Sequence, residues 1–303
     1  MTPINRKGIL WVFLICGGIS LLIWARTQKY DSFSWIKPFE VSYLIPGANR
    51  DTLQLKNLIS NLTGTYAILV YRLDNQTWYG INEDMKMPAA SIMKVPIMVA
   101  VLQNLKLEDE YILNNSDKQS GSGSIEFLDE GTALTIKELI TEMGEKSDNT
   151  ATNVLVQKVG NDAVLKILSD WKMDKTDYEQ NTITANDVSK MWQQVYKKPE
   201  LWDFLQDSIY EDRITLGLPE GMQFVHKVGT DDGVWSDSGI IQCSVLSAQC
   251  SVKPFILVIL TKDTNREEAE KIVPEITRII WEYEVKYAEL QSPSPRPPTP
   301  QSK

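Results

Sequence analysis

Residues 91–98 read Ser-Ile-Met-Lys-Val-Pro-Ile-Met and open a nearly continuous apolar segment that extends to Leu107. This pattern predicts a helix buried on most sides. Pro96 is tolerated near its first turn, because the amide proton that proline lacks would have no helical partner there. In such a helix Ser91 and Lys94 lie on one face, so a hydroxyl and an amine come within reach of each other. The segment therefore pairs a candidate nucleophile with a candidate base.

Two further polar motifs follow this pair in chain order, and they matter because the Ser-x-x-Lys spacing alone is weak evidence. The same spacing recurs at residues 34–37 and 169–172. Ser147-Asp148-Asn149 comes between two predicted helices, where short polar side chains can also serve only to cap a helix. Lys227-Val228-Gly229-Thr230 then stands in a strand-like run. The ordered set of motifs, rather than any one of them, singles out Ser91.

The hydrophobic periodicity of the whole chain predicts an α/β (α+β) architecture. Helical patterns occur at residues 51–62, 91–107, 135–143, 149–159, 162–171, 185–196 and 266–287, and strand patterns at residues 66–73, 78–81, 224–230, 234–241 and 255–261. The order is one helix, two strands, a block of helices, three strands and one helix. This order indicates that the two ends of the chain form one layer and that the middle forms a separate helical part.

Composition and cysteine usage argue against several classes of function. The chain of 303 residues carries a net charge of −9, and an acidic balance without a long basic run argues against a nucleic-acid partner. His226 is the single histidine and no Cys-x-x-Cys pair occurs, so we expect neither a zinc site nor another cofactor. Cys243 and Cys250 flank a short segment between strand patterns. They either form a disulfide, if this part lies outside the cytosol, or remain two small apolar residues.

Residues 9–25 form an uncharged apolar segment with basic residues on both sides, at the short end of the length that crosses a bilayer. A cleaved signal peptide is the alternative, but the absence of a small-x-small cleavage pattern favours an uncleaved signal anchor. We therefore expect a single-pass protein of the cell membrane whose folded part is extracytoplasmic. The expected divisions are a cytoplasmic N-terminus and anchor at 1–29, a stalk at 30–50, a folded domain at 51–290 and a Pro-rich disordered tail at 291–303.

The motifs and their order resemble those of the class A β-lactamases and of the related penicillin-binding serine acyltransferases. The resemblance spans roughly residues 50 to 290 and extends to residues beside the motifs, including Leu134-Thr-Ile-Lys-Glu-Leu-Ile and Thr184-Ala-Asn-Asp-Val. It implies a β-lactamase/transpeptidase-like catalytic domain. Such a domain has a five-stranded antiparallel sheet flanked by the terminal helices, together with an all-helical subdomain.

The resemblance also implies a catalytic role for four residues. Ser91 would attack an amide carbonyl and become acylated. Lys94 would be the base, because burial and the nearby Lys227 cation lower its pKa. Ser147 would relay a proton to the leaving nitrogen, and Lys227 would attract a substrate carboxylate.

Three further residues would bind the substrate. Asn149 would hydrogen-bond the substrate amide or Lys94, and Gly229 and Thr230 would line the strand on which the substrate lies. The developing oxyanion would be held by two backbone amides, those of Ser91 and Thr230.

Two departures from the family pattern affect this chemistry. Val228 stands where many relatives carry a hydroxyl residue after the lysine, a role that Thr230 can take over. The loop at residues 171–184 lacks the Glu-x-x-x-Asn pattern that positions the deacylating water in the lactamases. Asp177 and Glu179 are candidate acids for deacylation, and the alternative is that both are solvated surface charges. Acylation is therefore better supported than deacylation.

Three functions are consistent with these features. The first is a membrane-anchored, class A β-lactamase-like serine hydrolase that opens the β-lactam amide through a Ser91 acyl-enzyme. The second is a penicillin-binding or D-alanyl peptidase-like acyltransferase or esterase on cell-wall peptides, with slow deacylation, which the anchor and the missing glutamate favour. The third is a catalytically silent cell-envelope binding module. We expect a monomer that uses residues 9–25 to attach to the membrane. A Ser-His-Asp triad is disfavoured, because it would have to use His226 beside Lys227.

Overall fold

The computed structural model describes residues 48–244 and 251–291. These residues fall within Val41–Lys303, one of the two compact units into which the chain divides. The predicted anchor at residues 9–25, most of the predicted stalk and the Pro-rich tail lie outside the described residues. Among the helices that the structure does describe, none combines the length and the apolar character needed to span a membrane.

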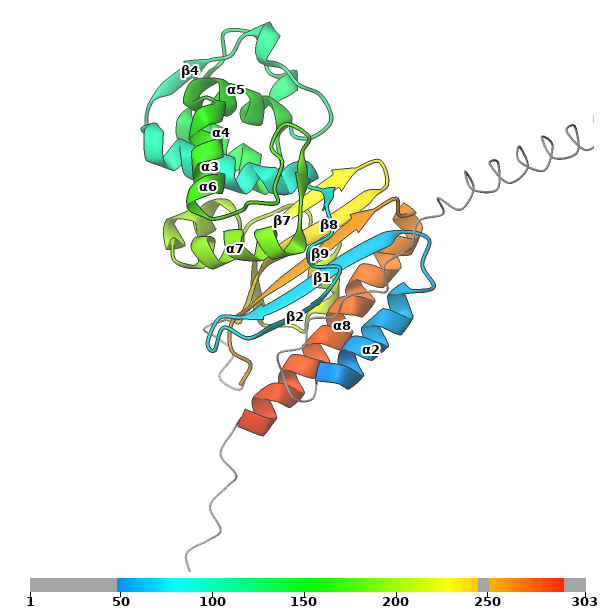
Figure 1. Ribbon diagram of the computed structural model, residues 1–303. Helices are drawn as coiled ribbons and strands as arrows, with labels where there is room; N and C mark the ends of the chain where they lie inside the picture. The colour runs from blue at the N-terminus through cyan, green and yellow to red at the C-terminus, as the bar shows by residue number, and fades with distance from the viewer. Residues whose placement is uncertain (1–47, 245–250, 292–303) are drawn as a thin grey trace, which may run out of the picture. The chain divides into compact units, whose positions relative to one another are not determined.

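A five-stranded antiparallel sheet forms the base of the fold, with the strand order β2-β1-β9-β8-β7 (Figure 1). Its strands are β1 (Thr65–Arg72), β2 (Trp78–Ile81), β7 (Met222–Asp231), β8 (Val234–Cys243) and β9 (Phe255–Lys262). Strand β9 is central because its apolar run is buried on both faces, which suits a strand with neighbours on either side. The predicted sheet is thus confirmed, and β7, which carries the lysine motif, lies at one edge of it.

Two hydrophobic cores lie on opposite faces of the sheet. The terminal helices α2 (Ala48–Ile59) and α8 (Arg266–Gln291) cover one face (Figure 1). Their apolar side chains pack against Ile68 and Val70. Ala67 and Leu69 point to the other core, because successive side chains of a strand face opposite ways. That second core is shared with α7 (Ala185–Tyr196) and with the helices between β2 and β7.

The middle of the chain forms the predicted helical part. Its helices are α3 (Lys94–Asn104), α4 (Ile136–Glu145), α5 (Asn149–Val159) and α6 (Asn161–Asp170). This part also holds short 3₁₀ turns and two small antiparallel pairs that the sequence did not predict. The pairs are β3 (Met87–Pro88) with β6 (Thr182–Ile183), and β4 (Glu110–Ile112) with β5 (Ala133–Thr135). Pairs of two or three residues are too short to produce a recognisable alternation.

The helix predicted from residue 91 differs in its first turn and its end. Residues Ala90–Met93 form the 3₁₀ turn η1, and the α-helix begins at Lys94 and ends at Asn104 rather than at Leu107. Beyond it, Leu105 has an extended backbone, with φ −121° and ψ 156°. The apolar pattern continues past the helix because the following residues pack against the same core.

Candidate active site

Ser91 lies in the 3₁₀ turn η1, between β3 and the buried helix α3. The residue before it, Ala90, has a φ of 46°, in the left-handed region that non-glycine residues rarely adopt. The turn is held from both sides. The amide of Ala89 donates to the carbonyl of Asn181 at 2.9 Å, and a Cβ at Gly229 would lie only 2.9 Å from the carbonyl oxygen of Ala89. Because Gly229 has no side chain, β7, the strand that also carries Lys227, can lie close to the segment that carries Ser91.

Lys94 brings the first two motifs together. Its Nζ donates to Asn149 Oδ1 at 2.7 Å and to the carbonyl oxygen of Ser147 at 2.5 Å, and lies 3.3 Å from Ser147 Oγ. The side chain is 6% exposed. Burial lowers the pKa of Lys94 to about 8, against the opposing charge of Asp148. With that pKa, roughly a tenth of this amine is neutral at pH 7, and the neutral form is the one that a general base requires.

The Ser147-Asp148-Asn149 turn is rigidly supported. Ser147 has a φ of 56°, and Asp148 caps α5 by accepting from the amide of Ala151. The same carboxylate accepts from the amide of Ser124 at 2.7 Å. The segment 120–124 therefore contacts this turn directly. In return, the amide of Asn149 donates to Ser122 O and its side-chain nitrogen to Ser120 O.

Lys227 lies on β7 with 1% of its surface exposed. Its Nζ has no hydrogen-bond partner in the described part of the chain. Burial lowers the pKa of Lys227 well below its usual range. The Lys94 and Arg213 cations lower it further, while the charge of Asp237 opposes them. An anion that reaches a buried ammonium group without a partner would stabilise its charged form.

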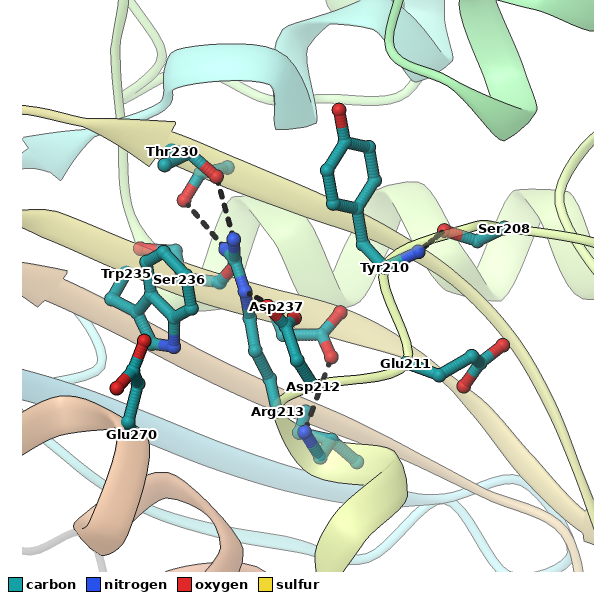
Figure 2. Close-up of polar contacts among 12 residues, drawn as sticks. Ser208, Tyr210, Glu211, Asp212, Arg213, Thr230, Trp235, Ser236, Asp237 and Glu270 are labelled. Atoms are coloured by element: carbon teal, nitrogen blue, oxygen red, sulfur yellow. Dashed lines mark hydrogen bonds and ion pairs between the residues drawn. The ribbon is translucent and has the colours of Figure 1, made fainter. Parts of the chain in front are cut away.

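Arg213 is a site residue that the sequence analysis missed (Figure 2). Its guanidinium donates to Thr230 Oγ1 at 2.6 Å, to Gly229 O at 3.1 Å and to Ser236 O at 2.7 Å. It also stacks over the ring of Trp235, 3.8 Å from the ring centroid. A single arginine in a polar loop carries no motif, so only the fold reveals that it adds a second cation beside Lys227.

His226 is packed away from this cluster, as expected. It is fully buried, its Nδ1 lies 2.9 Å from Asp237 Oδ1, and its ring stacks on Phe224 at 4.4 Å. Burial lowers the pKa of His226, but the charge and hydrogen bond of Asp237, aided by Glu211, outweigh it and raise the pKa to about 9. The charged imidazole therefore pairs β7 with β8 through Asp237 and is not the base for Ser91.

The loop at residues 171–184 carries the two candidate deacylation acids and contacts the segment before Ser91 through Asn181. The carboxylate of Asp177 accepts from the amide of Gln180 at 3.0 Å, within its own turn. Glu179 is exposed. Among the described residues, no hydrogen bond joins either carboxylate to Ser91 or Lys94. The exposure of Glu179 fits a surface charge, whereas Asp177 is half-buried, and the role of both acids in deacylation stays a prediction.

Comparisons with known proteins agree with this geometry. A model described as the β-lactamase enzyme family matches residues 52–284. The β-lactamase VEB-1 of Pseudomonas aeruginosa is 24% identical over 285 residues, which cover 81% of this chain and 94% of that protein. The solved β-lactamase of Sphaerobacter thermophilus has a TM-score of 0.70 at 22% identity and covers 82% of this chain and 100% of its own.

A second solved protein, PBP-A, is equally similar in structure. PBP-A has a TM-score of 0.72 at 19% identity, with 82% of this chain and 100% of that chain covered. A mutant of PBP-A, solved as an acyl-enzyme complex with penicillin G, has a TM-score of 0.71 at 18% identity, with 80% and 98% covered. At these identities the likeness establishes the β-lactamase/transpeptidase-like fold.

Proposed function

The chain belongs to the β-lactamase enzyme family, and we propose that it is a serine hydrolase that opens β-lactam amides through an acyl-enzyme on Ser91. One observation carries this proposal. Lys94, three residues along the chain from Ser91, is buried, has its pKa lowered to about 8, and contacts both Ser147 and Asn149. A base and a proton relay are thereby brought together from two motifs that are distant in the sequence, and the nucleophile lies three residues before the base.

Acylation follows from these contacts. The neutral amine of Lys94 takes the proton of the Ser91 hydroxyl as Oγ attacks the amide carbonyl carbon. Backbone amides of Ser91 and Thr230 stabilise the oxyanion. When the intermediate collapses, the carbon–nitrogen bond breaks and Ser147 donates its hydroxyl proton to the leaving nitrogen. Lys94 returns a proton to Ser147 through their 3.3 Å contact.

Substrate binding in this proposal depends on the two buried cations. Lys227 lacks a partner in the described residues, and Arg213 fixes the hydroxyl of Thr230 beside it. A carboxylate on the substrate would compensate the first cation and accept a hydrogen bond from that hydroxyl. Asn149 already contacts Lys94 through its oxygen, and its amide nitrogen donates to Ser120 O.

A second function is favoured by the loop at residues 171–184. Neither Asp177 nor Glu179 contacts Lys94, so the water that would release the acyl group has no evident base. Slow deacylation would make the protein a penicillin-binding, D-alanyl peptidase-like acyltransferase or esterase on cell-wall peptides. The penicillin G acyl-enzyme of the PBP-A mutant, a protein of the same fold, supports this alternative.

We place the enzyme outside the cytoplasm, anchored as a monomer by residues 9–25. The uncharged apolar segment with its basic flanks supports the anchor. Cys243 is disulfide-bonded, which suits an oxidising compartment, while its predicted partner Cys250 lies outside the described residues. Protease accessibility of the full chain in intact and lysed spheroplasts tests this placement. Protection of the folded domain in intact spheroplasts would refute it.

Incubation of the full chain with a chromogenic cephalosporin separates the two functions. Steady turnover supports the hydrolase, whereas a stoichiometric burst and a lasting mass adduct on Ser91 support the acyltransferase. Ser91→Ala should abolish both signals. The matched control is Ser169→Ala, because Ser169 begins another Ser-x-x-Lys spacing and is exposed. Labelling that survives Ser91→Ala would refute both functions.

A further inference from the structure

Residues 205–213, which we call the strap, connect the two halves of the site. On the helical side, the amide of Ile209 donates to the carbonyl of Glu145 at 3.1 Å, and the hydroxyl of Tyr210 donates to the carbonyl of Lys146 at 3.2 Å. These carbonyls belong to the two residues that directly precede Ser147. The strap therefore contacts Glu145 and Lys146, the two residues that lead into Ser147, the proposed proton relay.

The other side of the strap is bound to β7. The carbonyl of Leu205 accepts from the amide of His226 at 3.3 Å, and Arg213 donates to Gly229 O and Thr230 Oγ1. Lys227 lies between these two attachment points along β7. The strap thus joins the strand of the substrate-binding cation to the turn of Ser147, two elements that the chain separates by the whole of α5 to α7.

Tyr210 hydrogen-bonds through its side chain to the residue that directly precedes the turn. Its amide donates to Ser208 Oγ at 3.2 Å, which sets its backbone. In Figure 2 the ring of Tyr210 extends away from the side on which Glu211 and Arg213 lie. Its hydroxyl then reaches Lys146 O. Because a peptide unit is planar, a hydrogen bond to this carbonyl also restrains the amide nitrogen and Cα of Ser147.

This restraint acts on a strained residue. Ser147 has a φ of 56°, which costs a non-glycine residue free energy and persists only where the surroundings enforce it. In this conformation its carbonyl and hydroxyl both face Lys94 Nζ. Asp148 supports the turn on its far side, while Tyr210 supports the peptide unit that precedes Ser147.

We propose that Tyr210 is a positioning residue that holds Ser147 in its proton-relay geometry toward Lys94. The inference rests on the proposed acyl transfer through Ser91. Among the described residues Tyr210 has no hydrogen bond to Lys94 or to the Ser147 hydroxyl, so it acts through the peptide unit between Lys146 and Ser147. Its removal slows the step that Ser147 serves and leaves binding on the β7 side unchanged.

A double-mutant cycle in the full chain tests this role. Tyr210→Phe should slow acylation by a penicillin about two- to tenfold, the range of one net hydrogen bond, with the half-saturating concentration unchanged. The slowing should disappear in a Ser147→Ala background, because coupled residues are not additive. Tyr196→Phe is the control, since Tyr196 is a partly buried tyrosine whose hydroxyl has no hydrogen bond among the described residues. Equal slowing in both backgrounds would overturn the proposal.

Hydrogen exchange provides a readout that does not require activity. The amides of Asp148 and Asn149 donate to Glu142 O and Ser122 O, so their exchange reports the stability of the turn. Both should exchange about two- to tenfold faster in Tyr210→Phe and at the wild-type rate in Tyr196→Phe. Unchanged exchange in Tyr210→Phe would overturn the role of Tyr210. If Ser91 is never acylated in the wild type, the proposed function fails, and exchange alone decides the positioning role.

Discussion

Two buried cations of this molecule are treated in opposite ways. Arg72, at the end of β1, is 3% exposed and makes a two-pronged ion pair with Glu284 of α8, with distances of 2.7 and 2.9 Å. Its guanidinium also lies 3.7 Å from the ring centroid of Tyr287. Lys227, on β7, is 1% exposed, yet its ammonium group has no hydrogen-bond partner in the described part of the chain.

The paired Arg72 contributes to the stability of the fold, whereas the unpaired Lys227 is a candidate for function. Burying either cation is costly, and only at Arg72 does the fold supply the compensating anion and hydrogen bonds. That pair connects a strand to the C-terminal helix, so it serves the fold. At Lys227 the described residues supply no hydrogen-bond partner, and perturbed groups of this kind gather at functional sites. The same comparison yields four predictions.

The largest effect is expected at the paired cation. Glu284→Gln leaves Arg72 buried without its anion, so the free energy of unfolding should fall by about 3–5 kcal/mol. The acylation rate per folded molecule should stay at the wild-type value, because the pair lies outside the site. Denaturant unfolding and active-site titration measure the two quantities. Glu282→Gln, an exposed change on the same helix, is the control, and equal stability of the two variants would contradict the comparison.

The unpaired cation should show the reverse pattern. Lys227→Met removes the charge that attracts the substrate carboxylate, so the second-order acylation constant for penicillins should fall about 100-fold. The melting temperature should hold or rise, since a buried unsatisfied group is replaced by an apolar chain of similar length. Stopped-flow labelling and thermal unfolding are the measurements. Lys137→Met, on the exposed face of α4, is the control, and a marked loss of stability in Lys227→Met would show that Lys227 serves the fold.

The pH dependence of acylation tests the base beside Lys227. Burial lowers the pKa of Lys94 to about 8, and only the neutral amine can accept the proton of Ser91. The second-order acylation constant reports the free enzyme, so it should rise about tenfold per pH unit below that pKa. At more alkaline pH it should fall again, because Lys227, whose pKa is lowered well below its usual range, loses the charge that attracts the substrate carboxylate. A profile measured from acidic to alkaline pH that is flat through pH 8 would exclude Lys94 as the base.

The smallest effect is expected in the loop at residues 171–184. Glu179→Gln and Asp177→Asn should change the rate of acyl-enzyme hydrolysis by less than about twofold, since neither carboxylate is hydrogen-bonded to Ser91 or Lys94 among the described residues. Mass spectrometry of the Ser91 adduct over time measures this rate. A drop of about 100-fold in either variant would identify a deacylation acid and favour the hydrolase over the acyltransferase.

The sequence alone was enough to predict most of the secondary structure and to identify the Ser-x-x-Lys and Ser-Asp-Asn motifs. Helices α5 and α7 and strand β2 have the predicted bounds, because their periodicity and capping residues are local signals. The Ser-x-x-Lys and Ser-Asp-Asn motifs were readable because each spans only a few residues. The missing glutamate of the loop at residues 171–184 was readable for the same reason.

Only the tertiary structure decided which cations are compensated and which residues support the site. The sequence does not show that Arg72 meets Glu284 while Lys227 stays unpaired, because each outcome depends on elements far apart in the chain. Arg213 and Tyr210 lie in an irregular loop without periodicity, and their contacts with β7 and Lys146 exist only once the sheet and helices have packed. Local pattern specifies elements, whereas burial and charge pairing are properties of the packed whole.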